Sequence, residues 1–124
     1  MMIRGLAAIA AATAVICGGC STSPQTPAAG SGTPSPQLAV NVSIKGGAVT
    51  PTNATLSARV SEPIVVHVDS DAADELHVHS TPDHSFEIQP TNGQTFEFTV
   101  NVPGKVDVEL HKLKKTIATI TVQP

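Results

Sequence analysis

Histidines gather in one short stretch of this 124-residue chain. Three of its five histidines, His77, His79 and His84, lie within eight residues, and a fourth, His111, ends a later strand-like run. Imidazole is the commonest metal ligand among protein side chains and the one that changes charge closest to neutral pH. We therefore expect any chemistry of this protein to involve these four residues.

His77 and His79 have a spacing that suits a shared metal ion. Side chains two positions apart on a β-strand point to the same face, with backbone positions about 6.5–7 Å apart. His84 follows a Ser-Thr-Pro-Asp turn that could fold it back toward the pair. His111 would join them if its strand lies beside theirs at the same end. The sequence predicts a metal site from these four histidines, and the alternative is that they are solvated surface residues.

The available donors limit the metal. Both methionines and both cysteines precede residue 21, so residues 38–124 contain neither a thiol nor a thioether. Copper(I) favours those sulfur ligands, whereas imidazole with carboxylate suits copper(II) or zinc. Asp83 and Glu75 flank the histidines as acceptors that would fix the imidazole tautomers. We expect copper(II) or another divalent ion, such as zinc or nickel, as the bound ion.

The first 19 residues have the features of an export signal. An Ala-rich apolar run over residues 5–16 follows a positive residue and is too short to span a bilayer. It leads to Gly18-Gly19-Cys20-Ser21, which resembles a bacterial lipobox, although Cys17 stands where such motifs usually carry Leu, Val or Ala. We expect a signal peptide over residues 1–19, acylation of Cys20 (palmitate among the acyl groups), and anchoring at the extracytoplasmic face of the cell membrane. An ordinary secretory signal is the alternative.

The remainder divides into a tether and one domain. Residues 21–37 are Ser, Thr, Pro, Gly, Ala and Gln without charge, so we expect residues 20–37, which begin with the lipidated cysteine, to be a disordered tether. Residues 38–124 form one small domain with few lysines, and nothing in them indicates nucleic-acid binding. They show no Ser-His-Asp order, and three Phe without Trp or Tyr provide little wall for a substrate pocket. We therefore expect that the protein is not an enzyme.

Short alternating runs separated by turns fill the domain. Asn92-Gly93 is a strong turn signal, and no run has a helical period. About eight strands at this spacing predict an all-β fold, an antiparallel Greek-key β-sandwich. Alternation puts His67 on an exposed face. The residues expected to point inward are Leu76, Val78, Phe86, Ile88, Phe96, Phe98, Val100, Val106, Val108 and Leu110.

The domain resembles a cupredoxin over nearly all of residues 38–124. The segments that carry the resemblance are Ile44–Pro51 (IKGGAVTP), Pro63–Ser70 (PIVVHVDS), Asp74–His77 (DELH) and Pro103–His111 (PGKVDVELH). The resemblance implies a cupredoxin-like sandwich. It also implies that His77 matches the first copper-binding histidine of the family and that His111 lies where the second begins.

The sequence departs from the family at the copper ligands. The family's cysteine falls at about Leu110, and no methionine follows His111. Blue-copper chemistry needs the cysteine thiolate, so electron transfer is not implied. We expect metal sequestration or delivery at the cell envelope. The alternatives are a metal-free structural or protein-interaction module and, less favoured, a copper enzyme similar to copper,zinc superoxide dismutase, which also has a His-x-His pair but needs longer metal-binding loops.

Overall fold

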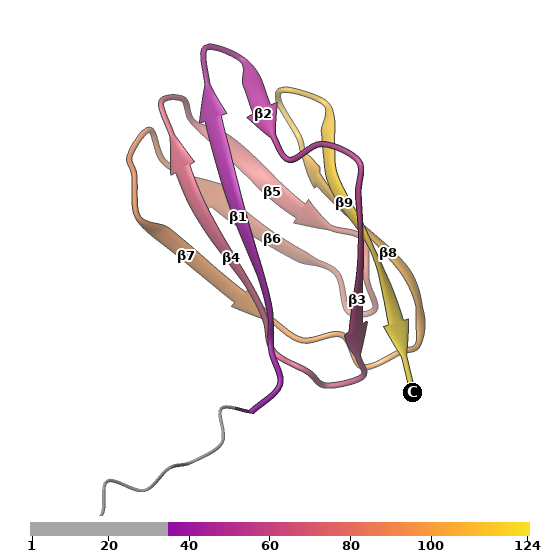
Figure 1. The fold of residues 1–124 in the computed structure, drawn as a ribbon. Helices are drawn as coiled ribbons and strands as arrows, with labels where there is room; N and C mark the ends of the chain where they lie inside the picture. The colour runs from indigo at the N-terminus through magenta and orange to yellow at the C-terminus, as the bar shows by residue number, and fades with distance from the viewer. Residues whose placement is uncertain (1–34) are drawn as a thin grey trace, which may run out of the picture. The chain divides into compact units, whose positions relative to one another are not determined.

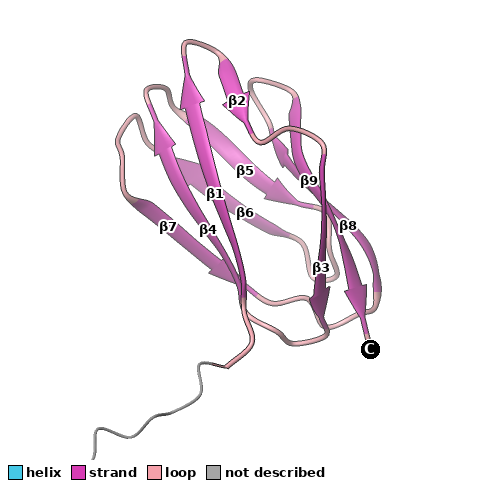
Figure 2. Cartoon of the chain, in the orientation of Figure 1, coloured by secondary structure: helices cyan, strands magenta, loops and turns pink. Residues whose placement is uncertain are grey.

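The structure, a computed structural model, describes residues 35–124. The expected signal peptide, Cys20 and most of the expected tether lie outside these described residues. Within them, strands are joined by loops and turns without a helix (Figure 2). No helix in this part is long and apolar enough to cross a membrane. The strands are β1 (Leu38–Lys45), β2 (Ala48–Thr50), β3 (Ala54–Arg59), β4 (Ile64–Ser70), β5 (Asp74–Val78), β6 (His84–Ile88), β7 (Gln94–Phe98), β8 (Gly104–Leu110) and β9 (Lys115–Gln123).

These strands form two sheets that pack face to face (Figure 1). One sheet has the order β2-β1-β4-β7 and the other has the order β3-β9-β8-β5-β6. Each sheet turns one face toward a shared apolar core and the other toward solvent. The fold is therefore the all-β sandwich that the alternation predicts.

Two details differ from the expected arrangement of about eight antiparallel strands. The structure has nine strands, because Ala48–Thr50 forms a short strand after the turn at Gly46 and Gly47, whose φ angles are 56° and 80°. Three residues are too few to show a period of two. The sheets are also mixed, since β1 pairs with β4 and β3 pairs with β9 in parallel. Parallel pairs need a connection that crosses over, and local patterns do not specify which strands it joins.

The core confirms the predicted side-chain directions. Eight of the ten residues expected to point inward are buried, and Phe86 and Phe96 are partly buried against the same core. His67 is exposed, as expected. Leu76 and Val78, which flank His77, are fully buried. Their burial stabilises the fold by about 1.5–3 kcal/mol each and fixes the outward direction of His77 between them and of His79 after them.

Candidate metal centre

His77 and His79 lie side by side on the outer face of the five-stranded sheet. His77 belongs to β5, and His79 follows the last residue of that strand. Their ring centroids are 4.2 Å apart, and the ring planes are tilted by 42°. The backbone N–H of His79 still donates to the carbonyl of Asp107 on β8 at 2.9 Å, so the sheet pairing continues past the strand end. The structure therefore brings this predicted pair together.

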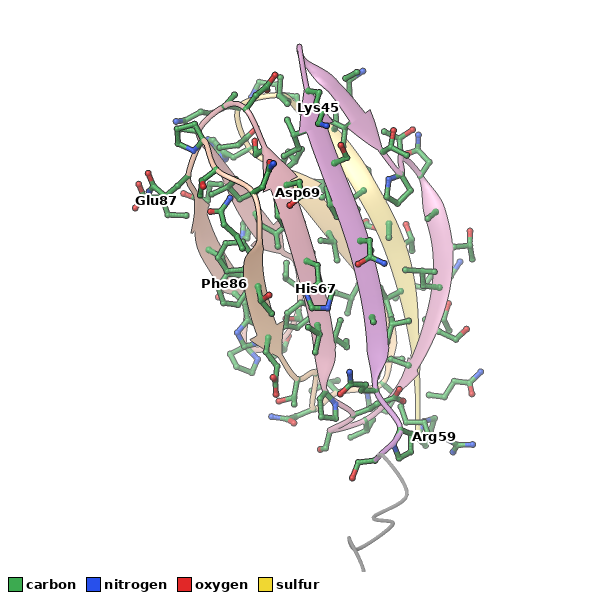
Figure 3. The ribbon with its side chains drawn as sticks, turned by 60° about the vertical axis from the view of Figure 1, so that its left-hand side comes forward. Lys45, Arg59, His67, Asp69, Phe86 and Glu87 are labelled. Atoms are coloured by element: carbon green, nitrogen blue, oxygen red, sulfur yellow. The ribbon has the colours of Figure 1, made fainter. Side chains whose placement is uncertain are left out.

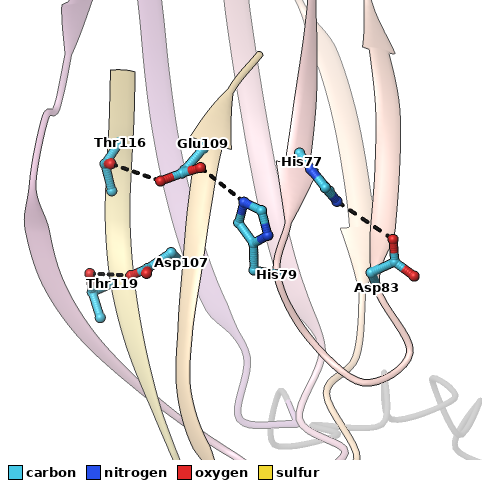
Figure 4. Close-up of polar contacts among 7 residues, drawn as sticks. All are labelled: His77, His79, Asp83, Asp107, Glu109, Thr116 and Thr119. Atoms are coloured by element: carbon cyan, nitrogen blue, oxygen red, sulfur yellow. Dashed lines mark hydrogen bonds and ion pairs between the residues drawn. The ribbon is translucent and has the colours of Figure 1, made fainter. Parts of the chain in front are cut away.

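A carboxylate from the neighbouring strand contacts His79. The Nε2–H of His79 donates to Oε2 of Glu109 at 2.9 Å (Figure 4). The hydroxyl of Thr116 on β9 donates to the other carboxylate oxygen at 3.2 Å. Glu109 is not among the residues that the sequence predicts for the site. Alternation places it on an outward face, but its partner is 30 residues away in the chain and depends on which strands are neighbours.

His77 has a looser acidic partner. Its Nε2 lies 3.5 Å from Oδ2 of Asp83, in the loop between β5 and β6 (Figure 4). The side chain of Asp83 is 74% exposed, so this contact contributes little to stability. Asp83 is one of the two acceptors that the sequence predicts. The other, Glu75, makes no hydrogen bond or ion pair with a histidine side chain among residues 35–124; instead its carbonyl accepts from the backbone N–H of His111.

His84 lies on the opposite face of the same sheet from the pair. It is the first residue of β6 and stands opposite the buried Val78 in the register. Side chains at opposed positions share a face, so His84 points inward with Phe86 and Ile88. Its Nε2–H donates to the carbonyl of Thr99 at 3.1 Å. The strand β6 begins at His84, directly after the turn, and its register with β5 places His84 on the inner face. The turn therefore does not bring His84 back to His77 and His79.

His111 shares the outer face with the pair but belongs to a different level of the sheet. Leu76 pairs with Leu110 and His77 with Glu109, so His111 stands opposite Glu75. Outward positions on one strand are about 6.5–7 Å apart, which puts His111 one level from His77 and two levels from His79. Glu109 occupies the intervening position on β8. The antiparallel register therefore separates His111 from His79.

Of the four histidines predicted to form one site, the structure gathers two. Within residues 35–124, no group of three or more His, Asp or Glu side chains is arranged to hold a metal ion. The candidate centre is consequently the pair His77 and His79, with Glu109 and Asp83 at their Nε2 atoms. Two imidazoles leave further coordination positions for water or for a ligand from another molecule.

A fifth histidine, His67, lies on the other sheet. It projects from the outer face of β4 near Asp69 (Figure 3), and its Nδ1 lies 3.1 Å from the hydroxyl of Thr95. Asn41, Val42, Ser43 and Thr50 complete a shallow hollow around His67 and Asp69. His67 and Asp69 are the only two of these side chains with strong metal-ligand character, and Asp69 already accepts from the backbone N–H of Gly93 at 2.7 Å. His67 therefore serves as a comparison residue for the pair on β5.

Comparison with known proteins supports the fold. No protein-family model matches the chain, and no curated protein matches it in sequence. Auracyanin from the photosynthetic bacterium Roseiflexus castenholzii superposes with a TM-score of 0.51 at 10% identity, over 71% of this chain and 98% of that one. A variant of amicyanin in a reduced Cu(I) form superposes with a TM-score of 0.47 at 13% identity, over 68% of this chain and 82% of that one. The auracyanin likeness shows that the fold is cupredoxin-like.

The donor set does not fit a blue-copper ion. Such a centre takes a cysteine thiolate, two histidines and a weak axial ligand that is commonly methionine. Residues 35–124 supply histidines but no cysteine and no methionine. The cupredoxin-like frame is thus combined with imidazole and carboxylate donors alone.

Proposed function

We propose that this protein is a membrane-anchored, extracytoplasmic lipoprotein whose cupredoxin-like domain binds copper(II) or zinc through His77 and His79. The role is sequestration or delivery of the ion, without an enzymatic reaction and without blue-copper electron transfer. The observation that carries the proposal is the pair of imidazoles 4.2 Å apart on one exposed face. Imidazole nitrogen suits both ions, and a pair at this separation can contribute two ligands to one ion.

The open coordination sphere supports a carrier role. Structural zinc sites are closed by four protein ligands, whereas this pair supplies two. An ion held by two imidazoles exchanges its remaining ligands with water, and a second molecule can take them over. The neighbouring carboxylates add negative charge beside the ion. These features favour reversible binding.

Calorimetric titration tests this function directly. The metal-free full chain, purified from membranes in detergent, is titrated with copper(II) and with zinc. We expect one ion per chain, and we expect His77→Ala/His79→Ala to weaken binding about 10-fold or more, because both ligands are lost. Affinity should fall as the pH is lowered, because protons compete with the ion for the imidazole nitrogens.

His67→Ala is the matched control for this titration. It also removes an exposed strand imidazole, but one on the other sheet, and we expect binding to be unchanged. Equal heats from the wild-type chain and from the double variant would rule out His77 and His79 as the site.

A metal-free structural or protein-interaction module is the second candidate. One observation favours it: within residues 35–124, no three His, Asp or Glu side chains are arranged around a common ion position. The same titration separates the two candidates. A wild-type chain that gives no saturable heat with either ion supports the module and contradicts the metal-binding proposal. The superoxide dismutase-like alternative predicts activity above free copper in the copper-loaded chain.

A further inference from the structure

The carboxylate of Glu109 is held at two points. Oε2 accepts from Nε2–H of His79 at 2.9 Å, and Oε1 accepts from the hydroxyl of Thr116 at 3.2 Å. Figure 4 shows Glu109 between the two partners, with β9 on one side and β5 on the other. Its orientation is therefore fixed from both neighbouring strands.

A β-bulge creates this arrangement. Val108 pairs with Ala118, but the next residue, Glu109, pairs with Thr116 and not with Ile117. The extra residue, Ile117, is fully buried. Bulges of this kind redirect a side chain, and here the bulge brings a hydroxyl to the outer face beside Glu109. Without it, Glu109 would stand opposite an apolar residue.

Other carboxylates on this face do not compete for His79. Asp107 stands opposite His79 across the sheet, but its Oδ1 accepts from the hydroxyl of Thr119 at 2.6 Å. Asp83 contacts His77 and is mostly exposed. Glu109 is consequently the carboxylate that determines the state of the His79 ring.

The hydrogen bond to Glu109 specifies which ring nitrogen carries the proton. An ionised carboxylate accepts hydrogen bonds and has none to donate, so Nε2 of His79 must be the protonated nitrogen. In the neutral ring, Nδ1 then carries the lone pair, and a metal ion binds at that lone pair. Nδ1 lies on the side of the ring that faces His77 (Figure 4). The lone pair is thus directed toward the other imidazole.

We infer that Glu109 is a positioning residue of the metal site: clamped by Thr116, it holds His79 as the Nε2–H tautomer, so that Nδ1 is the metal ligand. This inference rests on the proposed function. It names the nitrogen that binds the ion and a residue that acts through His79 without touching the ion. A carboxylate in this place also raises the basicity of the imidazole ligand.

Nitrogen NMR of the histidine rings tests the inference. Long-range ¹H–¹⁵N spectra are recorded on the ¹⁵N-labelled, metal-free full chain in detergent. With five histidines in the chain, His79→Ala is sufficient to assign the signals of His79. We expect His79 to show one tautomer with Nε2 protonated. In Glu109→Ala we expect signals averaged between the two tautomers, because the acceptor at Nε2 is lost.

Zinc addition provides the second measurement. In the wild-type chain, the ¹⁵N signal that moves on binding should be Nδ1 of His79, and Glu109→Ala should weaken zinc binding about 10- to 100-fold. Glu109→Gln should restore the single tautomer, because its carbonyl oxygen still accepts from Nε2–H. Glu87→Ala removes an exposed carboxylate from the outer face of β6 and should change neither result.

The possible outcomes separate the inference from the proposed function. The same tautomer signals in wild type and Glu109→Ala, or zinc bound through Nε2, would overturn the role of Glu109 while leaving metal binding in place. A wild-type chain that binds neither zinc nor copper(II) would overturn the proposed function and the positioning role together. A single tautomer that depends on Glu109, with zinc at Nδ1, supports both.

Discussion

His84 packs against phenylalanines of the sandwich and has surroundings unlike those of the exposed histidines. Its ring centroid is 5.4 Å from that of Phe98 and 6.2 Å from that of Phe86, to which it is nearly parallel. Its Nε2–H is used by the carbonyl of Thr99, just beyond β7. The side chain therefore links β6 to the end of β7 on the open side between the two sheets. We infer a structural role for it.

His84→Ala tests this division between the histidines. We expect the free energy of unfolding to fall by about 1–3 kcal/mol, since the change removes ring packing and leaves a partly buried carbonyl without its donor. Urea denaturation measures the loss, and metal titration of the same variant should match the wild type. His67→Ala, an exposed control, should change stability by about 0.5 kcal/mol or less. Weakened metal binding in His84→Ala would contradict this structural role and indicate that His84 is part of the metal site.

Alternation predicted the direction of individual side chains but not their partners. His77 and His79 could be placed on one outward face because Leu76 and Val78 demand burial. The sequence does not show where β6 begins after the turn, because that position depends on the pairing of β6 with β5. The inward direction of His84 could therefore not be predicted. The contact between Glu109 and His79 depends on strand order, and the clamp by Thr116 depends on a bulge. Neither feature has a local signal in the sequence.

At the scale of elements, Asp74 joins two loops at one end of the sandwich. It is 3% exposed, and its Oδ1 accepts from the backbone N–H of Lys112 at 2.7 Å. Its Oδ2 accepts from Leu113 at 3.1 Å, and Oδ1 also accepts from Glu75 at 2.7 Å. The start of β5 is thereby tied to the turn between β8 and β9. This turn contains His111, so the carboxylate also fixes where that histidine lies.

Asp74→Ala should destabilise the domain more than a comparable change at the surface. Three backbone donors in partly buried positions lose their acceptor, and we expect the free energy of unfolding to fall by about 2–3 kcal/mol. Asp71→Ala is the control, because its exposed carboxylate also accepts from a backbone N–H, that of Gly46 at 2.8 Å. We expect a loss of about 0.5–1 kcal/mol there. Equal losses in chemical denaturation would show that burial of Asp74 is not what matters.

The strands predicted from the sequence agree with the structure better than their predicted pairing does. The eight longer strands were recognisable because each has alternating residues and a turn at its end. Their sheet assignment was not, since the parallel pairs β1–β4 and β3–β9 join strands separated by other strands in sequence. The same missing information left the position of His111 open. Strand order thus limits both the fold prediction and the site prediction.

At the scale of the whole molecule, charge is distributed unevenly along the chain. No Lys or Arg lies between Arg59 and Lys105, whereas eight of the ten acidic residues do: Glu62, Asp69, Asp71, Asp74, Glu75, Asp83, Glu87 and Glu97. This stretch includes β5 and the histidine pair. A surface of one sign raises the local concentration of ions of the opposite sign. Beside the pair itself the carboxylates of Glu109 and Asp83 supply negative charge, which favours approach of a cation to His77 and His79.

The sequence around Cys20 predicts that acyl chains on this cysteine anchor the chain at the membrane. Several acyl chains on one cysteine anchor a protein firmly, whereas a single chain binds marginally. We expect the mature chain to enter the detergent phase in Triton X-114 partitioning and to incorporate labelled palmitate. Cys20→Ser should abolish the label and move the protein to the aqueous phase. Cys17→Ser is the matched control and should retain both, because that residue leaves with the signal peptide. A labelled Cys20→Ser variant would contradict the lipoprotein assignment. An unlabelled wild-type chain in the aqueous phase would indicate an ordinary secretory signal instead.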